Sequence, residues 1–229
     1  MKHLVVLSGA GMSAESGLGT FRDAGGLWEQ YKIEEVATPE AWAKNPELVT
    51  EFYNMRRKQC MECNPNEGHH ILAELENDFK VSVITQNIDN LHERAGSTNV
   101  LHLHGEIMKV KSSGPKQEET YYDWHKAEVK QSDVCPDGYP LRPHVVWFGE
   151  AVPALDQAAD IVSTADLFLV VGTSLQVYPA ASLVHYNPLG TPSYLIDPHA
   201  DEFRLSQFKQ IAKPVTEGMA IFKEIISKS

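Results

Sequence analysis

The sequence of 229 residues contains little cysteine, with only Cys60, Cys63 and Cys135. Three thiols cannot form the framework of several disulfides that holds small secreted domains together, so this scarcity favours a reducing compartment. We therefore expect a cytoplasmic protein whose fold depends on a hydrophobic core rather than on covalent cross-links.

Basic residues and long apolar runs are also scarce. The chain has 20 Lys and Arg against 31 Asp and Glu, which gives a net charge of −11 at pH 7. Because binding to a phosphate backbone needs clustered basic side chains, we expect no nucleic-acid partner. The first apolar run ends at Leu7 and no other stretch reaches the length of a membrane span, so we expect no membrane partner. The expected protein is a monomer whose acidic surface favours lysine-bearing peptides.

A regular alternation of apolar strand patterns and helical patterns is present throughout the chain. The strand patterns are HLVVLS, FKVSVIT, NVLHLHG, DLFLVVGTS and PSYLID. Helical patterns such as PELVTEFYNMRR and LDQAADIVSTAD lie between several of them. This alternation predicts an α/β fold with a Rossmann-like parallel sheet covered on both faces.

Two segments depart from the alternation and predict a small lobe formed by two insertions. One is helical with no strand pattern, and the other is irregular, polar and aromatic. The expected division is a Rossmann-like core of residues 1–30, 77–107 and 143–229, a helical insertion of 31–76 and a small module of 108–142.

The first strand pattern leads directly into a glycine-rich turn, Gly9-x-Gly11-x-x-Ala14. Such a turn brings the backbone close to a pyrophosphate and presents a helix N-terminus to it. On its own the pattern also fits glycine-rich turns of other α/β proteins. Hydride-transferring enzymes place an acidic residue about 20 positions on, at a strand end. Glu29 has that offset but lies in a helical pattern, so the turn indicates a nucleotide site of another kind.

Five separated motifs resemble those of the sirtuin family, NAD-dependent protein deacylases, and occur in the family's order. They are GAGMSAESGLGTFR, TQNIDNLHERAG, LHLHGE, HVVWFGE and VGTSLQVYPA. The resemblance implies that NAD is a consumed co-substrate and that acyl-lysine-bearing proteins or peptides are the partners. It further implies that the acyl oxygen attacks the ribose C1′ as nicotinamide leaves, and that water then releases free lysine and O-acyl-ADP-ribose.

The resemblance assigns catalysis to His104, Asn87 and Asp89. The histidine before the glycine is the general base, and a neutral imidazole accepts protons near neutral pH. His102 lies two residues earlier, and we expect it only to pack and hydrogen-bond. The residues assigned to NAD are Gly9, Ala10, Gly11, Ala14, Thr20, Phe21, Arg22, Trp28, Gln86, Asn87, Ile88, Asp89, Gly172, Thr173, Ser174, Asp197 and Ala212. Many sirtuins have Asn where this chain has Asp197.

The acyl group and the peptide are expected to contact two further segments. Tyr53 and Arg56 lie three apart on a predicted helix, and a phenol beside a guanidinium binds a carboxylate. Tyr-x-x-Arg resembles a motif of the sirtuin subgroup that removes succinyl and malonyl groups. An alternative is that Arg56 is exposed to solvent and pairs with Glu51 or Glu62. Peptide contacts are expected from Val146, Phe148 and Gly149.

The family's usual zinc-binding cysteines are missing from the 108–142 module, where Cys135 is the only cysteine. One thiolate cannot form a tetrahedral structural site, so we expect no zinc and no other metal. Compensating packing is expected from an aromatic cluster of Tyr121, Tyr122, Trp124 and Tyr139. The Cys60–Cys63 pair is expected to pack at a helix end rather than bind a metal.

Two other functions are compatible with the same motifs. One is a mono-ADP-ribosyltransferase or NAD glycohydrolase on the same scaffold. The other is a non-catalytic NAD-sensing or peptide-binding module, against which the set of His104, Asn87 and Asp89 argues.

Overall fold

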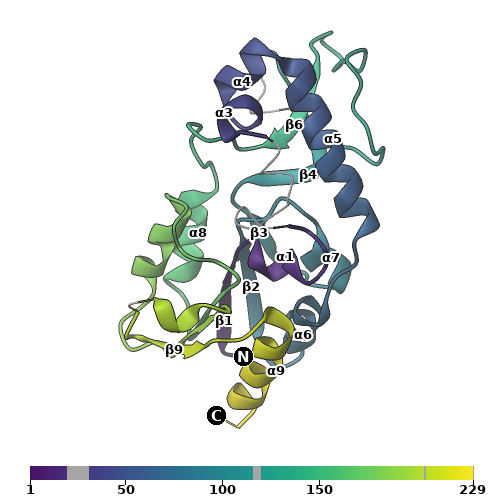
Figure 1. Cartoon of the computed structure of the whole chain (residues 1–229). Helices are drawn as coiled ribbons and strands as arrows, with labels where there is room; N and C mark the ends of the chain where they lie inside the picture. Colours follow the sequence, from purple (N-terminus) through teal and green to yellow (C-terminus); the bar gives the residue numbers. More distant parts are fainter. Residues whose placement is uncertain (20–30, 116–119, 204, 229) are drawn as a thin grey trace.

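A computed structural model describes residues 1–19, 31–115, 120–203 and 205–228 of the chain. Its centre is a six-stranded sheet in the order β3-β2-β1-β7-β8-β9, with every neighbouring pair parallel. The strands are β1 (His3–Ser8), β2 (Lys80–Thr85), β3 (Val100–His102), β7 (Leu167–Val171), β8 (Ser193–Ile196) and β9 (Phe208–Ile211). The predicted Rossmann-like parallel sheet is therefore confirmed (Figure 1).

Helices cover both faces of this sheet, because its central strands are apolar on both sides. One face packs against α6 (Glu67–Leu75) and α9 (Val215–Ile226), and the other against α8 (Leu155–Val162) and the 3-10 helix η1 (Ala180–Tyr186). Three short elements, α1 (Gly11–Ala14), α7 (Leu91–Ala95) and η2 (Ala200–Glu202), lie in the connections. No described helix has the length and apolar composition needed to cross a membrane.

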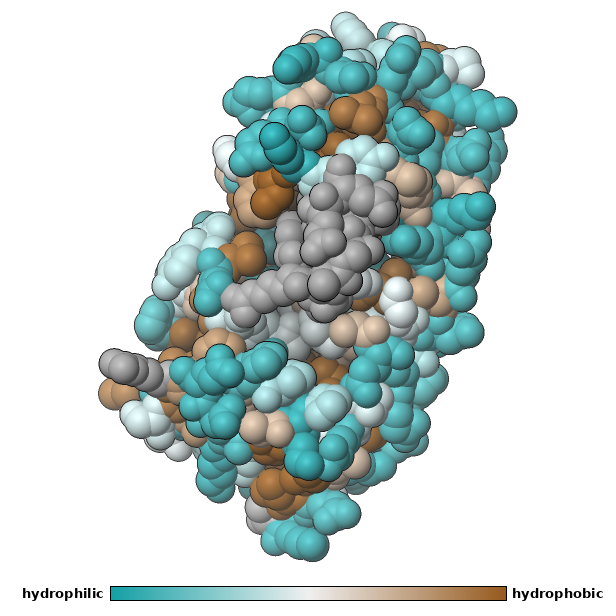
Figure 2. All heavy atoms as spheres, viewed as in Figure 1, coloured by the Kyte–Doolittle hydropathy of each residue, from teal (hydrophilic) through white to brown (hydrophobic). Residues whose placement is uncertain are grey.

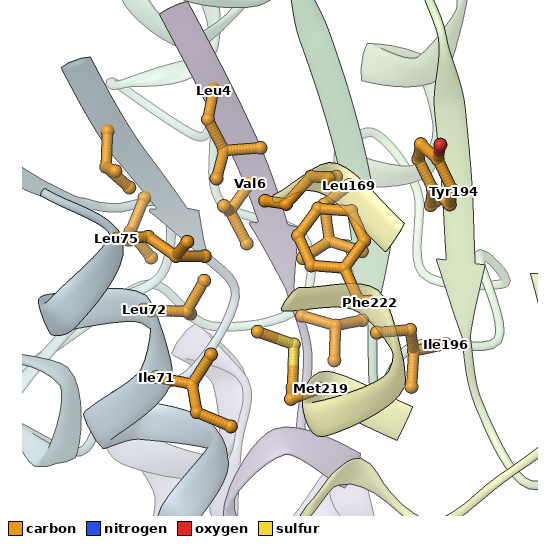
Figure 3. Packing of buried hydrophobic residues seen from close by; sticks show 14 of the residues in the cluster. Leu4, Val6, Ile71, Leu72, Leu75, Leu169, Tyr194, Ile196, Met219 and Phe222 are labelled. Carbon is orange, nitrogen blue, oxygen red and sulfur yellow. The ribbon is translucent and has the colours of Figure 1, made fainter. Parts of the chain in front are cut away.

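Figure 3 shows the core between the sheet and the helices α6 and α9. Leu4 and Val6 of β1 point toward Leu72 of α6, while Met219 and Phe222 of α9 fill the adjoining space. All five side chains are fully buried. At roughly 1.5–3 kcal/mol for each large apolar side chain, this layer is a main source of the folding free energy.

The small lobe begins with three helices, α3 (Ile33–Val36), α4 (Pro39–Lys44) and α5 (Pro46–Glu62). Sequence signals set where they start. Thr38 Oγ1 accepts the Ala41 N–H at 3.0 Å and Asn45 Oδ1 accepts the Leu48 N–H at 3.1 Å, and each cap is followed by proline. Such caps contribute about 1 kcal/mol each, and proline suits the first helical position.

An antiparallel sheet in the order β5-β4-β6 completes the small lobe. Its strands are β4 (Gly105–Ser112), β5 (Tyr121–Asp123) and β6 (Leu141–Val145). It thus extends a few residues beyond the predicted 108–142 module on both sides. The peptide motif Val146–Glu150 follows β6 instead of belonging to it, and His104 lies beyond the end of β3.

The predicted aromatic cluster of this module is only half correct. Tyr122 and Trp124 pack against a small buried cluster that includes Val110 and Cys135. Tyr121 and Tyr139, by contrast, are 53% and 43% exposed. Tyr121 instead stacks on His144, with 4.7 Å between the ring centroids. The small cluster is filled by aliphatic residues and a cysteine, namely Val110, Val129, Cys135 and Leu141, and only two of the four rings pack against it.

The visible outer face of the molecule is mostly hydrophilic, with small scattered hydrophobic groups (Figure 2).

Candidate functional site

The main cavity of the described structure has a volume of about 760 Å³ and lies at the carboxyl ends of β1, β2, β7 and β8. This is the edge at which open α/β sheets bind ligands. The small lobe contributes the opposite wall. Predicted site residues that line the cavity are Gly9, Ala10, Gly11, Ala14, Tyr53, Arg56, Gln86, Asn87, Ile88, Asp89, His104, Val146, Phe148, Gly149, Gly172, Thr173, Ser174 and Asp197.

Five predicted NAD residues are not among these lining residues. Thr20, Phe21, Arg22 and Trp28 lie outside the described residues. Ala212 is exposed between β9 and α9, and its role near the adenine stays a prediction.

The glycine turn after β1 is held against the end of β7 by backbone hydrogen bonds. The Gly9 N–H donates to the Val171 carbonyl at 3.1 Å, and the Gly11 N–H donates to the Gly172 carbonyl at 2.8 Å. Gly172 has φ +62°, and a Cβ there would lie 2.2 Å from the Met12 nitrogen. Glycine is needed at this crossing, which keeps both turns at the cavity wall.

A buried hydrogen-bond network connects this turn to the β2 end. Ser13 Oγ donates to Asp89 Oδ2 at 3.0 Å and accepts from Asn87 Nδ2 at 3.2 Å. Burial raises the pKa of the Asp89 carboxyl, while the Leu91 N–H and Ser13 oppose the shift. Sequence analysis missed Ser13, although its place within GMSAES next to the glycine turn was the available signal.

His104 is oriented by the backbone of the β2 end. Its Nδ1 lies 2.9 Å from the Gln86 carbonyl oxygen, which can only accept, so Nδ1 carries the proton and Nε2 keeps its lone pair. Burial lowers the pKa of the imidazole, and the bond to Gln86 opposes this only in part. The side chain is therefore a neutral imidazole at the cavity wall.

His102 has the opposite electrostatic setting. Its Nδ1 lies 2.9 Å from the Asn87 carbonyl and its Nε2 lies 2.7 Å from Glu93 Oε1. Two acceptors require two N–H groups, which favours the imidazolium. Burial lowers the pKa of His102, but hydrogen bonding and charge attraction from Glu93 outweigh it and raise the pKa overall. His102 therefore holds α7 against the β2–α7 connection.

Further polar groups sit at the ends of β2, β7 and β8. Gln86 Nε2 donates to Thr173 Oγ1 at 3.2 Å, which joins two cavity walls. Asp197 follows β8, and its Oδ1 accepts the His199 N–H at 2.9 Å. That contact fixes the carboxylate at the cavity edge.

Tyr53 and Arg56 lie on α5 and both line the cavity, at the small-lobe wall. Tyr53 is only 3% exposed, and burial raises the pKa of its phenol. Burial lowers the pKa of Arg56, while the Asp89 carboxylate opposes the shift. An arginine nevertheless stays charged in proteins, so a neutral phenol and a guanidinium face the same cavity.

The loop after β6 has one buried and one exposed aromatic residue. Phe148 is 42% exposed at the cavity, and its N–H donates to the Ala37 carbonyl at 3.0 Å. Trp147 is 2% exposed, and its Nε1 donates to Tyr53 Oη at 3.1 Å. This loop therefore contacts both the cavity and α5.

The cysteine pair lies at the end of α5. The Arg94 guanidinium donates to the carbonyl oxygens of Cys60 at 3.0 Å and Cys63 at 2.6 Å, which satisfies the free carbonyls of the helix end. Cys135 lies in the small module, 3.4 Å from Ser112 Oγ. Among the described residues, no group of three or more His, Cys, Asp or Glu side chains could hold a metal ion.

Comparison with known sequences identifies close relatives of one kind. Residues 9–179 match the Sir2 family. An NAD-dependent protein deacylase of Bacteroides thetaiotaomicron is 54% identical over 230 residues, which cover 99% of this chain and 98% of the relative. An NAD-dependent protein deacylase of Helicobacter pylori is 53% identical over 207 residues, or 90% of this chain and 87% of the relative.

Solved structures of the same kind share the fold. A variant Sir2 homologue in complex with ADP-ribose matches with a TM-score of 0.89 and 40% identity, over 99% of this chain and 92% of that one. A Sir2 homologue–NAD complex matches with a TM-score of 0.88 and 40% identity, over 99% of this chain and 90% of that one. A Sir2 variant with a deacetylated p53 peptide and 3′-O-acetyl ADP-ribose matches with a TM-score of 0.77 and 30% identity, over 97% of this chain and 92% of that one.

Proposed function

The chain belongs to the Sir2 family and is an NAD-dependent protein deacylase, and on that premise we propose that it removes succinyl and malonyl groups as well as acetyl groups from lysine. The observation that supports this acyl range is the pair of Tyr53 and Arg56 on the wall of the same cavity as His104. The relatives' names do not favour an ADP-ribosyltransferase, a glycohydrolase or a non-catalytic module.

NAD fits the residues of the large-domain wall. The turn of Gly9 and Gly11 allows the close backbone approach that a pyrophosphate needs, and the Asp197 carboxylate can accept from ribose hydroxyls. When bound, NAD supplies an electrophilic sugar carbon that carries nicotinamide as a leaving group. The network of Ser13, Asn87 and Asp89 can then orient the sugar and the carboxamide with donors and acceptors that are already fixed.

His104 provides the base. Its Nε2 lone pair takes up the proton that a sugar hydroxyl gives up, while the Nδ1–H bond to Gln86 holds the ring in place. Burial keeps the ring neutral at pH 7, since it lowers the pKa below the ordinary 6.5.

The acylated peptide would lie along the loop that follows β6. Extended peptides commonly bind by backbone hydrogen bonds while one side chain enters a pocket. Val146, Phe148 and Gly149 line the cavity here, and Gly149 has φ +92°. A lysine that entered between Phe148 and His104 would carry its acyl chain toward α5.

At α5, the far carboxylate of a succinyl or malonyl group would meet Tyr53 and Arg56. The guanidinium gives charge-assisted hydrogen bonds, and the phenol gives a neutral one. Because Tyr53 is buried and Arg56 is half-buried, the pair attracts an acyl carboxylate more strongly than an exposed pair would. An acetyl group fits the same space without these contacts, so both activities are proposed.

Replacement of Arg56 by Met tests the acyl range. Arg56→Met should lower kcat/KM for a succinyl-lysine peptide by about tenfold to a hundredfold more than for the matching acetyl-lysine peptide, because only the former loses a charge-assisted contact. Steady-state kinetics at saturating NAD measure both values. Lys58→Met is the matched control, since it removes a cation from the exposed side of the same helix. Equal losses on both peptides would refute the proposed range.

The remaining expectations belong to the same proposal. A cytoplasmic location, a monomeric state and the absence of zinc stay predictions. The bacterial relatives are compatible with the cytoplasm, and the prediction about zinc rests on Cys135 being the only cysteine of residues 108–142. Elemental analysis of the purified protein that found one zinc per chain would contradict the expectation about the metal.

A further inference from the structure

One hydrogen bond connects the peptide loop to the proposed acyl-binding helix. Trp147 lies in the loop after β6, and its Nε1 donates to Tyr53 Oη on α5 at 3.1 Å. The two residues are 94 positions apart, and both are buried. The bond is therefore shielded from water. Hydrogen bonds are electrostatically stronger in such a low-dielectric interior than in water.

The indole is held in place on several sides. The Arg142 guanidinium carbon lies 3.4 Å from the centre of the Trp147 ring, and the Trp42 ring lies 5.8 Å away. Glu150 completes the arrangement, since its carboxylate accepts the Trp147 backbone N–H at 2.7 Å and pairs with Arg142 at 3.2 Å. The direction of the indole N–H is thus fixed by contacts independent of Tyr53.

Donor and acceptor rules then decide where the phenol proton points. An indole N–H can only donate, so Tyr53 Oη is the acceptor in this bond and its own proton is left to donate elsewhere. In the described parts of the chain, the hydroxyl makes no other hydrogen bond. Burial raises the pKa of Tyr53, so the phenol keeps this proton throughout the working pH range.

We propose that Trp147 is a positioning residue for acyl selectivity, because its indole occupies an acceptor site of Tyr53 and thereby directs the phenol proton into the cavity toward the carboxylate of a succinyl or malonyl chain. The inference rests on the proposed acyl range. It assigns to Trp147 a role beyond packing, in which one loop sets both the peptide path and the orientation of the acyl-binding phenol.

Kinetics of a double-mutant cycle test this role. Trp147→Phe keeps an aromatic ring but removes the N–H, and we expect KM for the succinyl peptide to rise about fivefold to tenfold more than KM for the acetyl peptide, the effect of one neutral hydrogen bond. The kcat ratio of the two substrates should change less. In a Tyr53→Phe background the same substitution should cause no additional loss of selectivity, because its effect acts through the phenol.

Trp124→Phe is the matched control, since it removes an indole N–H that donates to the Glu128 carbonyl and makes no bond to Tyr53. Proportional losses on both acyl peptides after Trp147→Phe, or a selectivity loss that adds to that of Tyr53→Phe, would overturn the inference. If Arg56→Met lowers the succinyl-to-acetyl ratio and Trp147→Phe does not, only the positioning role fails. If Arg56→Met also leaves the ratio unchanged, the proposed acyl range fails, and the inference fails with it.

A spectroscopic measurement covers the case in which Trp147→Phe does not fold. The indole N–H resonance of Trp147, observed in ¹⁵N-labelled protein, should move upfield in Tyr53→Phe because its acceptor is lost. The other indole resonances should stay in place. An unchanged Trp147 resonance would show that no such bond exists and would overturn the inference.

Discussion

At the scale of single residues, two histidines two positions apart differ in protonation because of what the second ring nitrogen meets. Both Nδ1 atoms lie near backbone carbonyls of the β2–α7 connection. Nε2 of His102 meets the Glu93 carboxylate, which favours the cation, whereas His104 lines the cavity and stays neutral. The sequence predicted that His102 packs and hydrogen-bonds while His104 acts as the base, but it could not predict Glu93 as the partner of His102 Nε2, which depends on the packing of α7.

The pH dependence of turnover should follow the protonation of His104. Only the neutral ring accepts a proton, so kcat should fall as the pH decreases through the His104 pKa. Burial lowers this pKa, so the midpoint of the acid limb should lie below 6.5. His104→Ala should lower kcat by about 10²- to 10⁴-fold. The exposed His70→Ala is the control for the loss of a histidine. An acid limb centred above 6.5, or full turnover by His104→Ala, would contradict the assigned role.

At the scale of elements, helix α6 is joined to the nucleotide turn through one side chain. Asn66 Oδ1 accepts the Gly68 N–H at 2.9 Å and so caps α6. Its Nδ2 donates to the Met12 carbonyl at 2.8 Å and to Ser16 Oγ at 3.1 Å. The sequence predicted the helix, but not this contact, because the partners are 50 or more positions away.

Two substitutions at Asn66 should separate these two roles. Asn66→Ala removes both, so it should destabilise the protein by about 1 kcal/mol and raise the KM for NAD about threefold to tenfold. Asn66→Asp keeps the capping oxygen and loses the Nδ2 donor, so it should raise the KM for NAD with a smaller loss of stability. Thermal unfolding and NAD titrations measure the two effects. An unchanged KM for NAD in Asn66→Asp would show that the contact to the turn is irrelevant.

At the scale of the whole molecule, the parallel sheet could be predicted from local patterns, whereas the packing of α6, part of the predicted 31–76 insertion, on that sheet could not. Strand–helix alternation predicted the parallel sheet, and the exceptions predicted a small lobe. Most of the predicted site residues meet at one cavity because the carboxyl ends of parallel strands share an edge. What could not be predicted depends on distant packing: the Ser13 network, the Trp147–Tyr53 bond and the exposure of Tyr121 and Tyr139.

The most direct test of the central claim is mass spectrometry of the products formed from NAD and a lysine peptide carrying an acetyl or succinyl group. We expect free lysine peptide, nicotinamide and O-acyl-ADP-ribose in equal amounts, with none formed when NAD is omitted. Acyl removal without NAD, or nicotinamide release with the acyl group still on the peptide, would contradict the account.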